Sequence, residues 1–404
     1  MNNVPCNISI MTTLHDVCKS GNIDAVKLMI MNGANVNEKN DCGETPLHVI
    51  SCMRFVGIAE LLISHSANVN EKNNDGNTAL HIACRCNDHD MAKLLVYHNA
   101  KVDEKNGNGI TPLRMAIFQR NYKNAELLVS HGADVNEMCN RCSILNSACT
   151  YRNYEIVKLL ITHGAKVNEK DQYESAPIFH AIIHYYYEIF DILITNGANI
   201  NVEDARGYTP LYYAVVHSQE KIVDVLISHG ANVNEKYNDG NTPLLEVCSR
   251  CGCLSIINAL IKNGANVNEK NNNGSTPLHE ICREGFYKNV AEIAVILISH
   301  GANINEKDQN GDTPLHIACD QLHYKTVKLF MLHGANVNEK NNNKETPTML
   351  VQKFKQTGVY QQSQTDVANN IEKFSEKEIS KRVYMLSLII NSDVLKHYIV
   401  KKID

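Results

Sequence analysis

A repeat of about 33 residues constrains the fold of this 404-residue chain more than any other feature. In its clearest copy, the octapeptide His-Gly-Ala-Asn-Val-Asn-Glu-Lys at 229–236 is followed six residues later by Thr242-Pro243-Leu244. The Leu of the Thr-Pro-Leu motif, or its equivalent, returns at intervals of 33, 33, 33, 32, 33, 33, 33, 34 and 37 residues: Leu14, Leu47, Leu80, Leu113, Leu145, Ile178, Leu211, Leu244, Leu278 and Leu315. Such a period predicts a solenoid of small units, each of which contacts only its neighbours.

Within each copy, the local motifs predict two helices. Thr242 suits a helix N-cap, and Pro243 suits the first helical position, where its missing N–H has no intrahelical partner to lose. The apolar block 222–227 has helical spacing, and Gly230 stands where that second helix must end in a left-handed residue. The segment 238–240, Asn-Asp-Gly, is typical of a tight turn. We therefore expect an all-α chain in which each unit is a helix, a short turn, a second helix and a projecting hairpin-like loop.

The spacing also predicts the domain boundaries. We expect an N-terminal leader at 1–10, the repeat array at 11–350, and a linker with a C-terminal helical cap at 351–404. Repeats are predicted to begin near residues 12, 45, 78, 111, 143, 176, 209, 242, 276 and 313, with a partial copy from 346. The one short interval places a deletion in the hairpin loop 138–142. Ser66 stands where the other repeats have Gly or Asn, so local strain or fraying is expected there.

Three copies of a Thr-Pro-Leu-His motif, at 45–48, 276–279 and 313–316, together with the Gly-Ala-Asn-Val-Asn motifs, resemble ankyrin repeats. The resemblance covers roughly residues 11–350. It implies helix pairs stacked in two layers with loops along one edge, and a His in the Thr-Pro-Leu-His motif that hydrogen-bonds the loop. It also implies that partner proteins bind the concave face made by the first helices and the loop tips. The Asn-, Lys- and Ile-rich composition of the repeats is similar to that of repeat proteins of large DNA viruses or protists.

Composition excludes several other classes of protein. The net charge of −5 disfavours a general phosphate-binding surface, which needs an excess of Lys and Arg. The most apolar stretch, 384–400, is interrupted by charged residues and does not suit a membrane span. The first ten residues lack the order of a signal peptide, so a cytoplasmic or nuclear location is expected. Five of the 14 cysteines share one register of the first helix, which predicts small buried side chains: Cys84, Cys149, Cys248, Cys282 and Cys319.

The chain carries no pattern that predicts catalysis or a cofactor. Cys139 and Cys142, and Cys248 and Cys251, have the local spacing of zinc ligands, but neither pair has a second pair nearby in sequence. No nucleophile triad, phosphate loop or carboxylate pair stands outside the repeat pattern. We therefore expect no enzyme activity, no metal, no cofactor, no small-molecule substrate, no nucleic-acid partner and a monomeric chain. The recurring Glu-Lys pairs, such as Glu235 and Lys236, predict a solvated ladder of alternating charge.

A specific function must therefore come from positions where the repeats differ. Between the fourth and eighth repeats, the end of the first helix, the turn that follows it and the loop tips become rich in Tyr and Arg, the residues enriched at binding hot spots. The alternative is that several of the aromatic residues there, Tyr154 and Tyr187 especially, pack only within the chain. The residues that we predict to contact a partner are Phe118, Gln119, Arg120, Tyr151, Arg152, Tyr173, His184, Tyr185, Tyr186, Tyr208, His217, Tyr237 and Arg250.

Three functional hypotheses follow. The first is a non-catalytic scaffold that binds a partner protein on the first helices and loop tips of repeats four to eight. The second is an adaptor that hands its partner to a ubiquitin ligase through residues 372–402, although this tail lacks the Leu-Pro pair of the viral docking box that it would resemble. The third is that the chain is itself a substrate, because Asn70, Asn168 and Asn234 resemble family targets of an asparaginyl hydroxylase.

Overall fold

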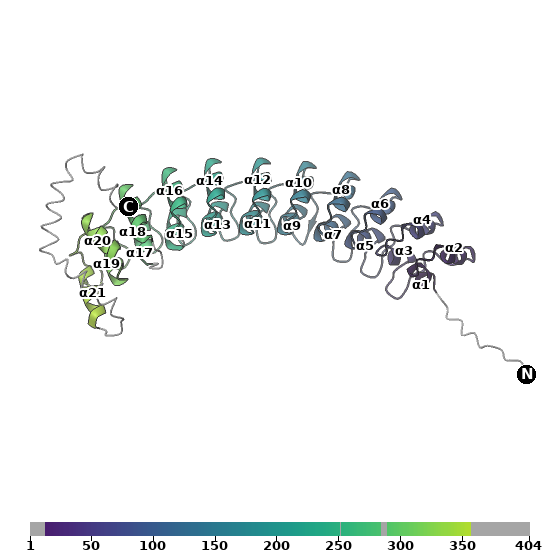
Figure 1. The fold of residues 1–404 in the computed structure, drawn as a ribbon, viewed down its shortest axis with the longest axis horizontal. Coiled ribbons are helices and arrows are strands. Elements are labelled where there is room, and N and C mark those ends of the chain that lie inside the picture. Colours follow the sequence, from purple (N-terminus) through teal and green to yellow (C-terminus); the bar gives the residue numbers. More distant parts are fainter. Residues whose placement is uncertain (1–12, 251, 284–288, 357–404) are drawn as a thin grey trace, which may run out of the picture. The chain divides into compact units, whose positions relative to one another are not determined.

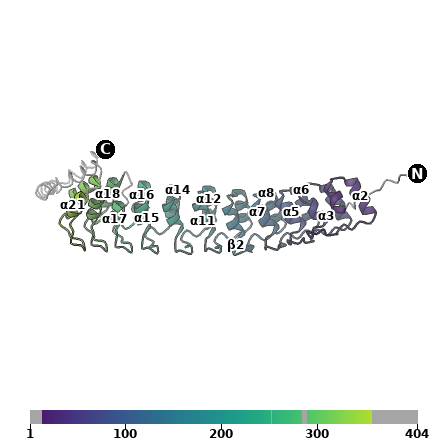
Figure 2. The same ribbon diagram turned by 90° about the horizontal axis from the view of Figure 1, so that it is seen from below.

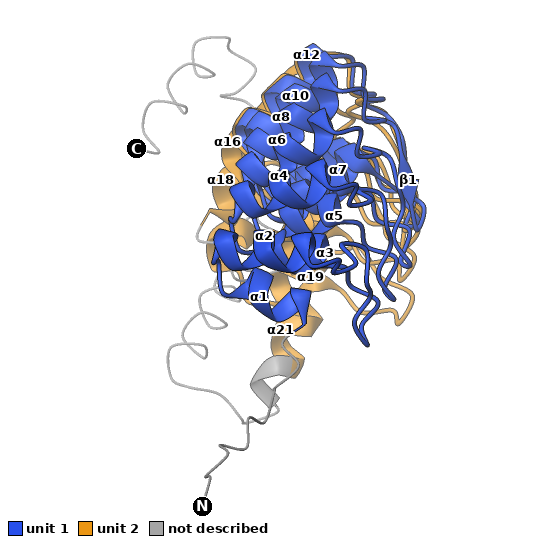
Figure 3. Ribbon diagram, turned by 90° about the vertical axis from the view of Figure 1, so that its right-hand side faces the viewer, with its two compact units in different colours: residues 1–199 blue, residues 200–404 orange. Residues whose placement is uncertain are grey.

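The computed structural model describes residues 13–250, 252–283 and 289–356. In these ranges the chain is almost entirely helical, with a single pair of two-residue strands. Its packing defines two compact units, unit 1 at residues 1–199 and unit 2 at residues 200–404 (Figure 3). In both units a short first helix and a longer second helix alternate, which confirms the expected solenoid of helix–turn–helix units.

Unit 1 holds six helix pairs, in which the first and second helices form two layers (Figure 1). Its first helices are α1 (Leu14–Lys19), α3 (Pro46–Ile50), α5 (Ala79–Arg85), α7 (Pro112–Phe118), α9 (Ile144–Thr150) and α11 (Pro177–Ile183). Its second helices are α2 (Ile23–Met31), α4 (Val56–Ser64), α6 (His89–Tyr97), α8 (Tyr122–Ser130), α10 (Tyr154–Thr162) and α12 (Tyr187–Thr195). The loops between pairs project along one edge of the unit (Figure 2).

Unit 2 repeats the same plan with four helix pairs and one additional first helix among its described residues. The first helices are α13 (Pro210–Val216), α15 (Pro243–Arg250), α17 (Pro277–Arg283), α19 (Pro314–Asp320) and α21 (Pro347–Gln356). The second helices are α14 (Glu220–Ser228), α16 (Leu254–Lys262), α18 (Val290–Ser299) and α20 (Tyr324–Leu332). Helix α21 lies in the predicted partial copy and packs against α19.

The Thr-Pro-Leu motif starts the first helices as its residue types predict. Thr45 has the extended backbone of an N-cap and Pro46 occupies the first turn of α3. Leu47 is 1% exposed, because it points between neighbouring helix pairs rather than to solvent. Burying a Leu of this kind stabilises the fold by about 1.5–3 kcal/mol, and the same position recurs in the other repeats. Each unit therefore has a continuous core that no single helix pair could form.

The second helices end in a left-handed residue, as the Gly positions predict. Gly132 has φ +86° and a side chain added there would meet no other atom, so the preference for Gly comes from the backbone alone. Ser66 takes the same conformation, with φ 69°. The strain expected at Ser66 is confirmed, but the expected fraying is wrong: α4 runs to Ser64, and the Ser66 N–H donates to the Ile63 carbonyl oxygen at 3.0 Å.

The shortened loop of unit 1 is the one regular hairpin among the described residues. Strands β1 (Met138–Cys139) and β2 (Cys142–Ser143) pair antiparallel, with Cys139 opposite Cys142. The two residues between them, Asn140 and Arg141, have φ values of 51° and 59°. Two successive left-handed residues are the pattern of a type I′ turn, which joins strands by the shortest route. The predicted deletion at 138–142 is therefore absorbed in the loop.

Some predictions fall outside the described residues. These are the leader at 1–10, Cys251, and the C-terminal cap within 357–404, including the segment 372–402 proposed for ubiquitin-ligase docking. They stay predictions. In the part of the chain that the structure describes, no helix combines the length and apolar character that crossing a membrane requires.

Candidate functional site

A buried histidine joins each regular helix pair to the loop of the next pair. The Nδ1 atom of His48 accepts from the N–H of Thr45 at 3.2 Å, which leaves Nε2 to donate to the carbonyl oxygen of Asn77 at 3.0 Å. Burial lowers the pKa of His48, and this arrangement uses the neutral ring. The same link to the next loop, at 2.9 to 3.1 Å, is made by His15, His81, His279 and His316. The role that the family resemblance implied for this His is therefore present.

The five central repeats have lost this histidine. Its position is taken by Arg114, Asn146, Phe179, Tyr212 and Leu245. Asn146 keeps part of the link, because its Nδ2 donates to the equivalent carbonyl oxygen of Ser175 at 3.4 Å, as well as to that of Glu169 at 3.0 Å. The loss coincides with the repeats in which the sequence predicts a binding surface. The substitution was visible in the sequence, but the sequence analysis did not use it, although the family resemblance already implied the role of the histidine.

Arg114 replaces the histidine with a buried ion pair that the sequence analysis missed. Its side chain is 3% exposed, and its Nε lies 2.7 Å from Glu137 Oε1. One terminal nitrogen donates to Ser147 Oγ at 2.7 Å and the other to the Cys142 carbonyl oxygen at 3.0 Å. Arg114 therefore holds the β1–β2 hairpin against the start of α9, which is a structural role rather than a free binding group.

Glu137 is also the residue that breaks the charge ladder in unit 1. Where the ladder is present, Lys in one loop pairs with Glu in the next loop, as Lys72 does with Glu104 at 2.7 Å, whereas Lys166 and Lys170 pair with Glu169 and Glu174 of their own loop. The same link joins Lys39 to Glu71, Lys236 to Glu269, Lys270 to Glu306, and Lys307 to Glu339. These side chains are partly exposed, and exposed pairs contribute at most about 1 kcal/mol each. The ladder is therefore a regular, partly exposed surface, as the sequence predicted.

The Asn residues considered as hydroxylation targets join adjacent repeats. Asn70 Nδ2 donates to the Asn99 carbonyl oxygen at 3.1 Å, and its Oδ1 accepts from the Lys101 N–H at 2.8 Å. Asn168 and Asn234 make the same two contacts with the repeats that follow them. An enzyme would have to open these links to reach the side chains.

In unit 1, eight of the predicted contact residues gather where the first helix turns into the second: Phe118, Gln119, Arg120, Tyr151, Arg152, His184, Tyr185 and Tyr186. We call this the turn surface of unit 1. The Phe118 and Tyr151 rings meet edge to face, with centroids 5.4 Å apart. The Arg152 guanidinium lies 5.3 Å from the Tyr186 ring centroid, and His184 stacks on the same ring at 5.4 Å. Each contact joins residues of the turn surface, and two of them cross between neighbouring repeats.

Three residues of the turn surface hold a backbone conformation that large side chains rarely take. Arg120, Arg152 and Tyr185 have φ values of 54°, 53° and 60°. A left-handed residue other than Gly costs about 1–2 kcal/mol, whereas a cation near a helix C-terminus returns about 0.3–1 kcal/mol. The interaction with the helix end therefore does not offset the strain. Arg54 and Leu322 occupy equivalent turns at 60° and 54°, so the conformation belongs to the turn and the choice of side chain is what varies.

The predicted loop-tip tyrosines do not behave alike. Tyr173 is 69% exposed and Tyr208 is half-buried, but Tyr237 is only 4% exposed, so its prediction as a partner-contacting loop tip is wrong. The Tyr237 ring packs against Tyr208 and Tyr212, with centroids 5.6 and 4.9 Å away. Tyr237 precedes the turn at 238–240, in the place held by Asn or Asp in most other loops. The Tyr237 side chain faces α13 rather than solvent.

In unit 2, aromatic rings form a row along α13. Tyr208 stacks on Tyr212 at 3.8 Å and meets Tyr213 edge to face at 6.3 Å, while Tyr213 stacks on His217 at 6.5 Å. The Tyr213 hydroxyl donates to Asp204 Oδ2 at 2.6 Å, and burial followed by this bond raises the pKa of Tyr213. The sequence placed Tyr208 and His217 at opposite ends of this helix, but the two tyrosines between them were missed.

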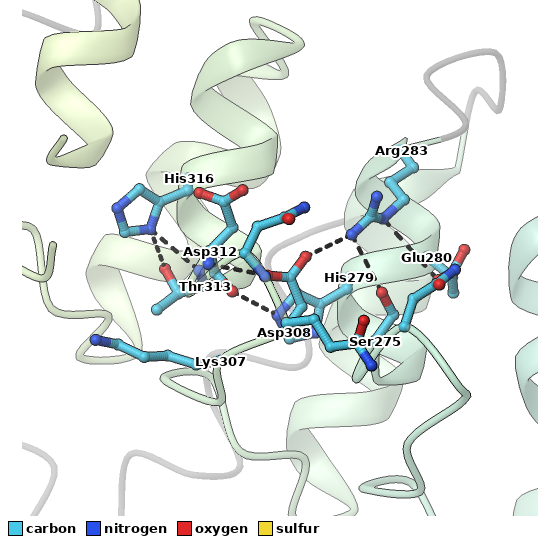
Figure 4. A network of polar contacts seen from close by, with 12 residues as sticks. Ser275, His279, Glu280, Arg283, Lys307, Asp308, Asp312, Thr313 and His316 are labelled. Atoms are coloured by element: carbon cyan, nitrogen blue, oxygen red, sulfur yellow. Dashed lines mark hydrogen bonds and ion pairs between the residues drawn. The ribbon is translucent and has the colours of Figure 1, made fainter. Parts of the chain in front are cut away.

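Two arginines of unit 2, Arg250 and Arg283, are held by carboxylates. Arg250 Nε lies 2.5 Å from Glu246 Oε2, whose side chain is almost fully buried, and this hydrogen bond raises the pKa of Arg250. Arg283 lies 2.6 Å from Asp308 Oδ2 and donates to Ser275 Oγ at 3.1 Å (Figure 4). The predicted contact residue Arg250 is therefore exposed but already engaged within the chain. Among the described residues, no cluster of three or more His, Cys, Asp or Glu could hold a metal ion.

The chain consists of stacked helix pairs. In its regular repeats the first helix begins at a capping Thr, a buried His contacts the next loop, and that loop projects from the stack. These features together define a class of repeat protein. The chain belongs to the ankyrin repeat family: a family model of three ankyrin repeat copies matches residues 14–106, 98–171, 145–237, 178–271 and 245–341. Proteins of this family generally mediate protein–protein interactions and are typically not enzymes.

Solved ankyrin structures resemble part of the chain. The ankyrin repeat domain of Bcl-3, a member of the IkappaB protein family, is 25% identical, covers 54% of this chain and 98% of its own, and has a TM-score of 0.49. The human ASB11 ankyrin repeat domain is 22% identical, covers 55% of this chain and 99% of its own, and has a TM-score of 0.47. No curated protein matches the sequence.

Proposed function

We propose that the chain is a non-catalytic scaffold that binds a partner protein through the turn surface of unit 1. The observation that carries this proposal is the choice of side chain at Arg120, Arg152 and Tyr185, which are exposed and stand at left-handed positions where Gly is the more stable choice. The same backbone recurs in turns outside this surface, so large Tyr and Arg side chains gathered in successive turns, rather than the strain alone, support a binding role. Tyr and Arg are also the residues that contribute most to protein–protein binding.

The links between repeats favour rigid presentation of this surface. The buried Arg114–Glu137 pair lies in the same repeats, and Asn136 Oδ1 accepts from the Lys166 N–H at 2.8 Å. Side chains that are already ordered lose little conformational freedom when a partner binds. The Phe118–Tyr151 and Arg152–Tyr186 contacts order the rings in the same way, so the surface is formed before the partner arrives.

The ring row of unit 2 is proposed as a second contact surface. Tyr208, Tyr213 and His217 are half-buried and lie along α13, with Tyr208 just before the helix and His217 at its C-cap. Their contacts to one another fix the rings, and their remaining exposed faces suit an apolar or aromatic side chain of a partner. Tyr237 is left out of this surface because it is buried.

Affinity capture with paired variants tests the proposal. The variant Tyr151→Ser, Tyr185→Asn, Tyr186→Ser removes three rings of the turn surface, and Asn suits the left-handed backbone at 185. The control Tyr97→Ser, Tyr122→Ser, Tyr154→Ser removes three rings from second helices. Both proteins should keep the helical circular dichroism of the unmodified chain. Proteins captured by the unmodified chain and the control, but lost with the first variant, would support the proposal; equal capture by all three would contradict it.

A further inference from the structure

Four arginines recur along the turns of successive repeats in unit 1. Arg54 precedes α4, Arg85 ends α5, Arg120 precedes α8 and Arg152 precedes α10, and all four are exposed. We call these residues the basic edge of unit 1. Only Arg120 and Arg152 were singled out by the sequence, because Arg54 and Arg85 lie outside the aromatic repeats.

The basic edge has no carboxylate partner within the described chain. Asp24, Asp90 and Glu155 stand in first turns of second helices, yet none forms an ion pair with these guanidinium groups. Arg152 instead lies over the Tyr186 ring. The arginines of the other described turns differ, because Arg250 and Arg283 are both paired with carboxylates.

The packing of unit 1 sets the spacing of the basic edge. Helix α4 packs on α6, α6 on α8 and α8 on α10, so the turns before them follow one another in register. Packed helices lie about 8–10 Å apart, and an extended chain advances about 3.3–3.6 Å per residue. Arg54, Arg120 and Arg152 hold the same turn position, whereas Arg85 stands two residues earlier, at the end of α5. Carboxylates at every third residue of an extended chain would therefore meet successive arginines, with an offset at Arg85. The Phe118–Tyr151 ring pair joins the two repeats that carry Arg120 and Arg152 and offers an apolar contact.

We infer that the basic edge binds an extended acidic segment of the partner protein, with carboxylates at about every third residue. Guanidinium groups form paired hydrogen bonds with carboxylates, and unlike Arg250 and Arg283 these four have no carboxylate to displace. The chain as a whole carries a net charge of −5, which opposes long polyanions such as nucleic acids more than a short peptide segment. This inference rests on the proposed scaffold function and names the chemistry of its partner.

Fluorescence anisotropy of labelled twelve-residue peptides tests the inference on the full chain. The probe peptide carries Asp at every third position with Gly and Ser between. A second peptide has Asn in place of Asp, a third has the four Asp residues contiguous, and a twelve-nucleotide oligo-dT provides a nucleic-acid probe. Titrations run at low ionic strength, because exposed charges are screened over about 10 Å at 0.1 M salt.

Two protein variants carry the same change in charge. The edge variant is Arg54→Asn, Arg85→Gln, Arg120→Asn, Arg152→Asn, in which Asn is placed at the left-handed residues that tolerate it. The control variant is Lys27→Gln, Lys93→Gln, Lys123→Gln, Lys158→Gln, which changes exposed residues of second helices in the same unit. Circular dichroism and thermal unfolding establish that both variants fold.

The spaced Asp peptide should bind the unmodified chain and the control alike, and bind the edge variant at least tenfold more weakly, since exposed charge pairs contribute about two- to fivefold each. The Asn peptide should not bind, and the contiguous peptide should bind at least threefold more weakly than the spaced peptide.

Three outcomes would overturn the inference. They are an equal loss of peptide binding in both variants, no binding of the spaced peptide to the unmodified chain, and tighter arginine-dependent binding of oligo-dT. Equal binding of the contiguous peptide would overturn the proposed spacing. If the peptides fail while the tyrosine variant still loses its captured protein, the scaffold proposal stands and only the acidic partner is wrong.

Discussion

Arg85 in unit 1 and Arg283 in unit 2 occupy the same place, at the end of a first helix, but they have different surroundings. Arg283 has Glu280 three residues before it and Asp308 in the following loop at 2.6 Å. At the matching positions Arg85 has the apolar Ile82 and the neutral Asn106. A carboxylate within the chain makes an arginine part of the structure, and its absence leaves the charge available to another molecule. The same rule separates buried Arg114 from its exposed neighbour Arg120.

The largest effect is expected where a paired arginine cannot reach solvent. Glu137→Ala leaves the buried Arg114 guanidinium without its carboxylate and should lower the free energy of unfolding by about 3–5 kcal/mol. The matched change Glu104→Ala removes the carboxylate of a partly exposed ladder pair and should cost about 1 kcal/mol or less. Hydrogen exchange should show lost protection in residues 111–150 for the first variant only. Similar losses in both would mean that burial of Arg114 does not matter.

Asp308→Asn should have a smaller effect, because it makes the surroundings of Arg283 resemble those of Arg85. Asp308 Oδ1 accepts from the N–H groups of Asn310 and Asp312 at 2.9 Å, and an Asn oxygen can keep both bonds. Only the ion pair is lost, and with a partly exposed arginine we expect a loss of about 1 kcal/mol. Urea unfolding measures this change. A loss as large as that of Glu137→Ala would show that the loop itself had been disrupted.

Arg120→Gly should change stability in the opposite direction. The substitution relieves a left-handed arginine with φ 54° and removes a cation near the end of α7, for a net gain of about 0.5–1 kcal/mol. Ser66→Gly provides the control, because it relieves the same strain outside the turn surface and should also stabilise the chain. Thermal unfolding should show both gains in stability. Only Arg120→Gly should lower the affinity of the chain for the spaced Asp peptide. Destabilisation by Arg120→Gly would mean that the arginine has a structural role.

The histidine links, which involve no carboxylate, should respond to pH. Burial lowers the pKa of His48, His81 and His279 from the ordinary value of 6.5. Their neutral forms are favoured in the fold, so their contribution is complete above about pH 6.5 and is lost as the pH falls through the lowered pKa values. The effect is absent at neutral pH, which makes it the smallest under ordinary conditions. Thermal midpoints from pH 8 to 5 should fall less steeply in His48→Asn, His81→Asn, His279→Asn than in the unmodified chain.

Most of the fold could be predicted because the same sequence signals for helix starts and helix ends recur in nearly every repeat. The Thr-Pro-Leu motif fixes a helix start, the Gly after the second helix fixes its end, and one short interval located the β1–β2 hairpin. Ser66 shows the limit of this reasoning. The motif identified its strained conformation, but whether the helix before it would fray depends on packing that the motif does not describe.

The candidate site was less predictable, because residue type does not reveal which neighbour a side chain meets. Tyr237 and Tyr173 are both loop tyrosines in sequence, yet one is buried against Tyr208 and Tyr212 and the other is exposed. Arg250 and Arg120 likewise both lie near the end of a first helix, but only Arg250 pairs with a carboxylate. Arg54 and Arg85 were missed because a search for aromatic neighbours excludes them, although their spacing of about one repeat was visible in the sequence.

The Asn carboxamides that join neighbouring repeats have a consequence for how such a chain can change length. Each one, as Asn234 does, donates to the end of the next second helix at 2.9 Å and accepts from the loop beyond it at 2.8 Å. A duplicated repeat would bring its own donor and acceptor and would find matching groups on both sides. The gene can therefore gain or lose whole repeats without any new contact having to evolve, while changes smaller than a repeat must be absorbed in a loop.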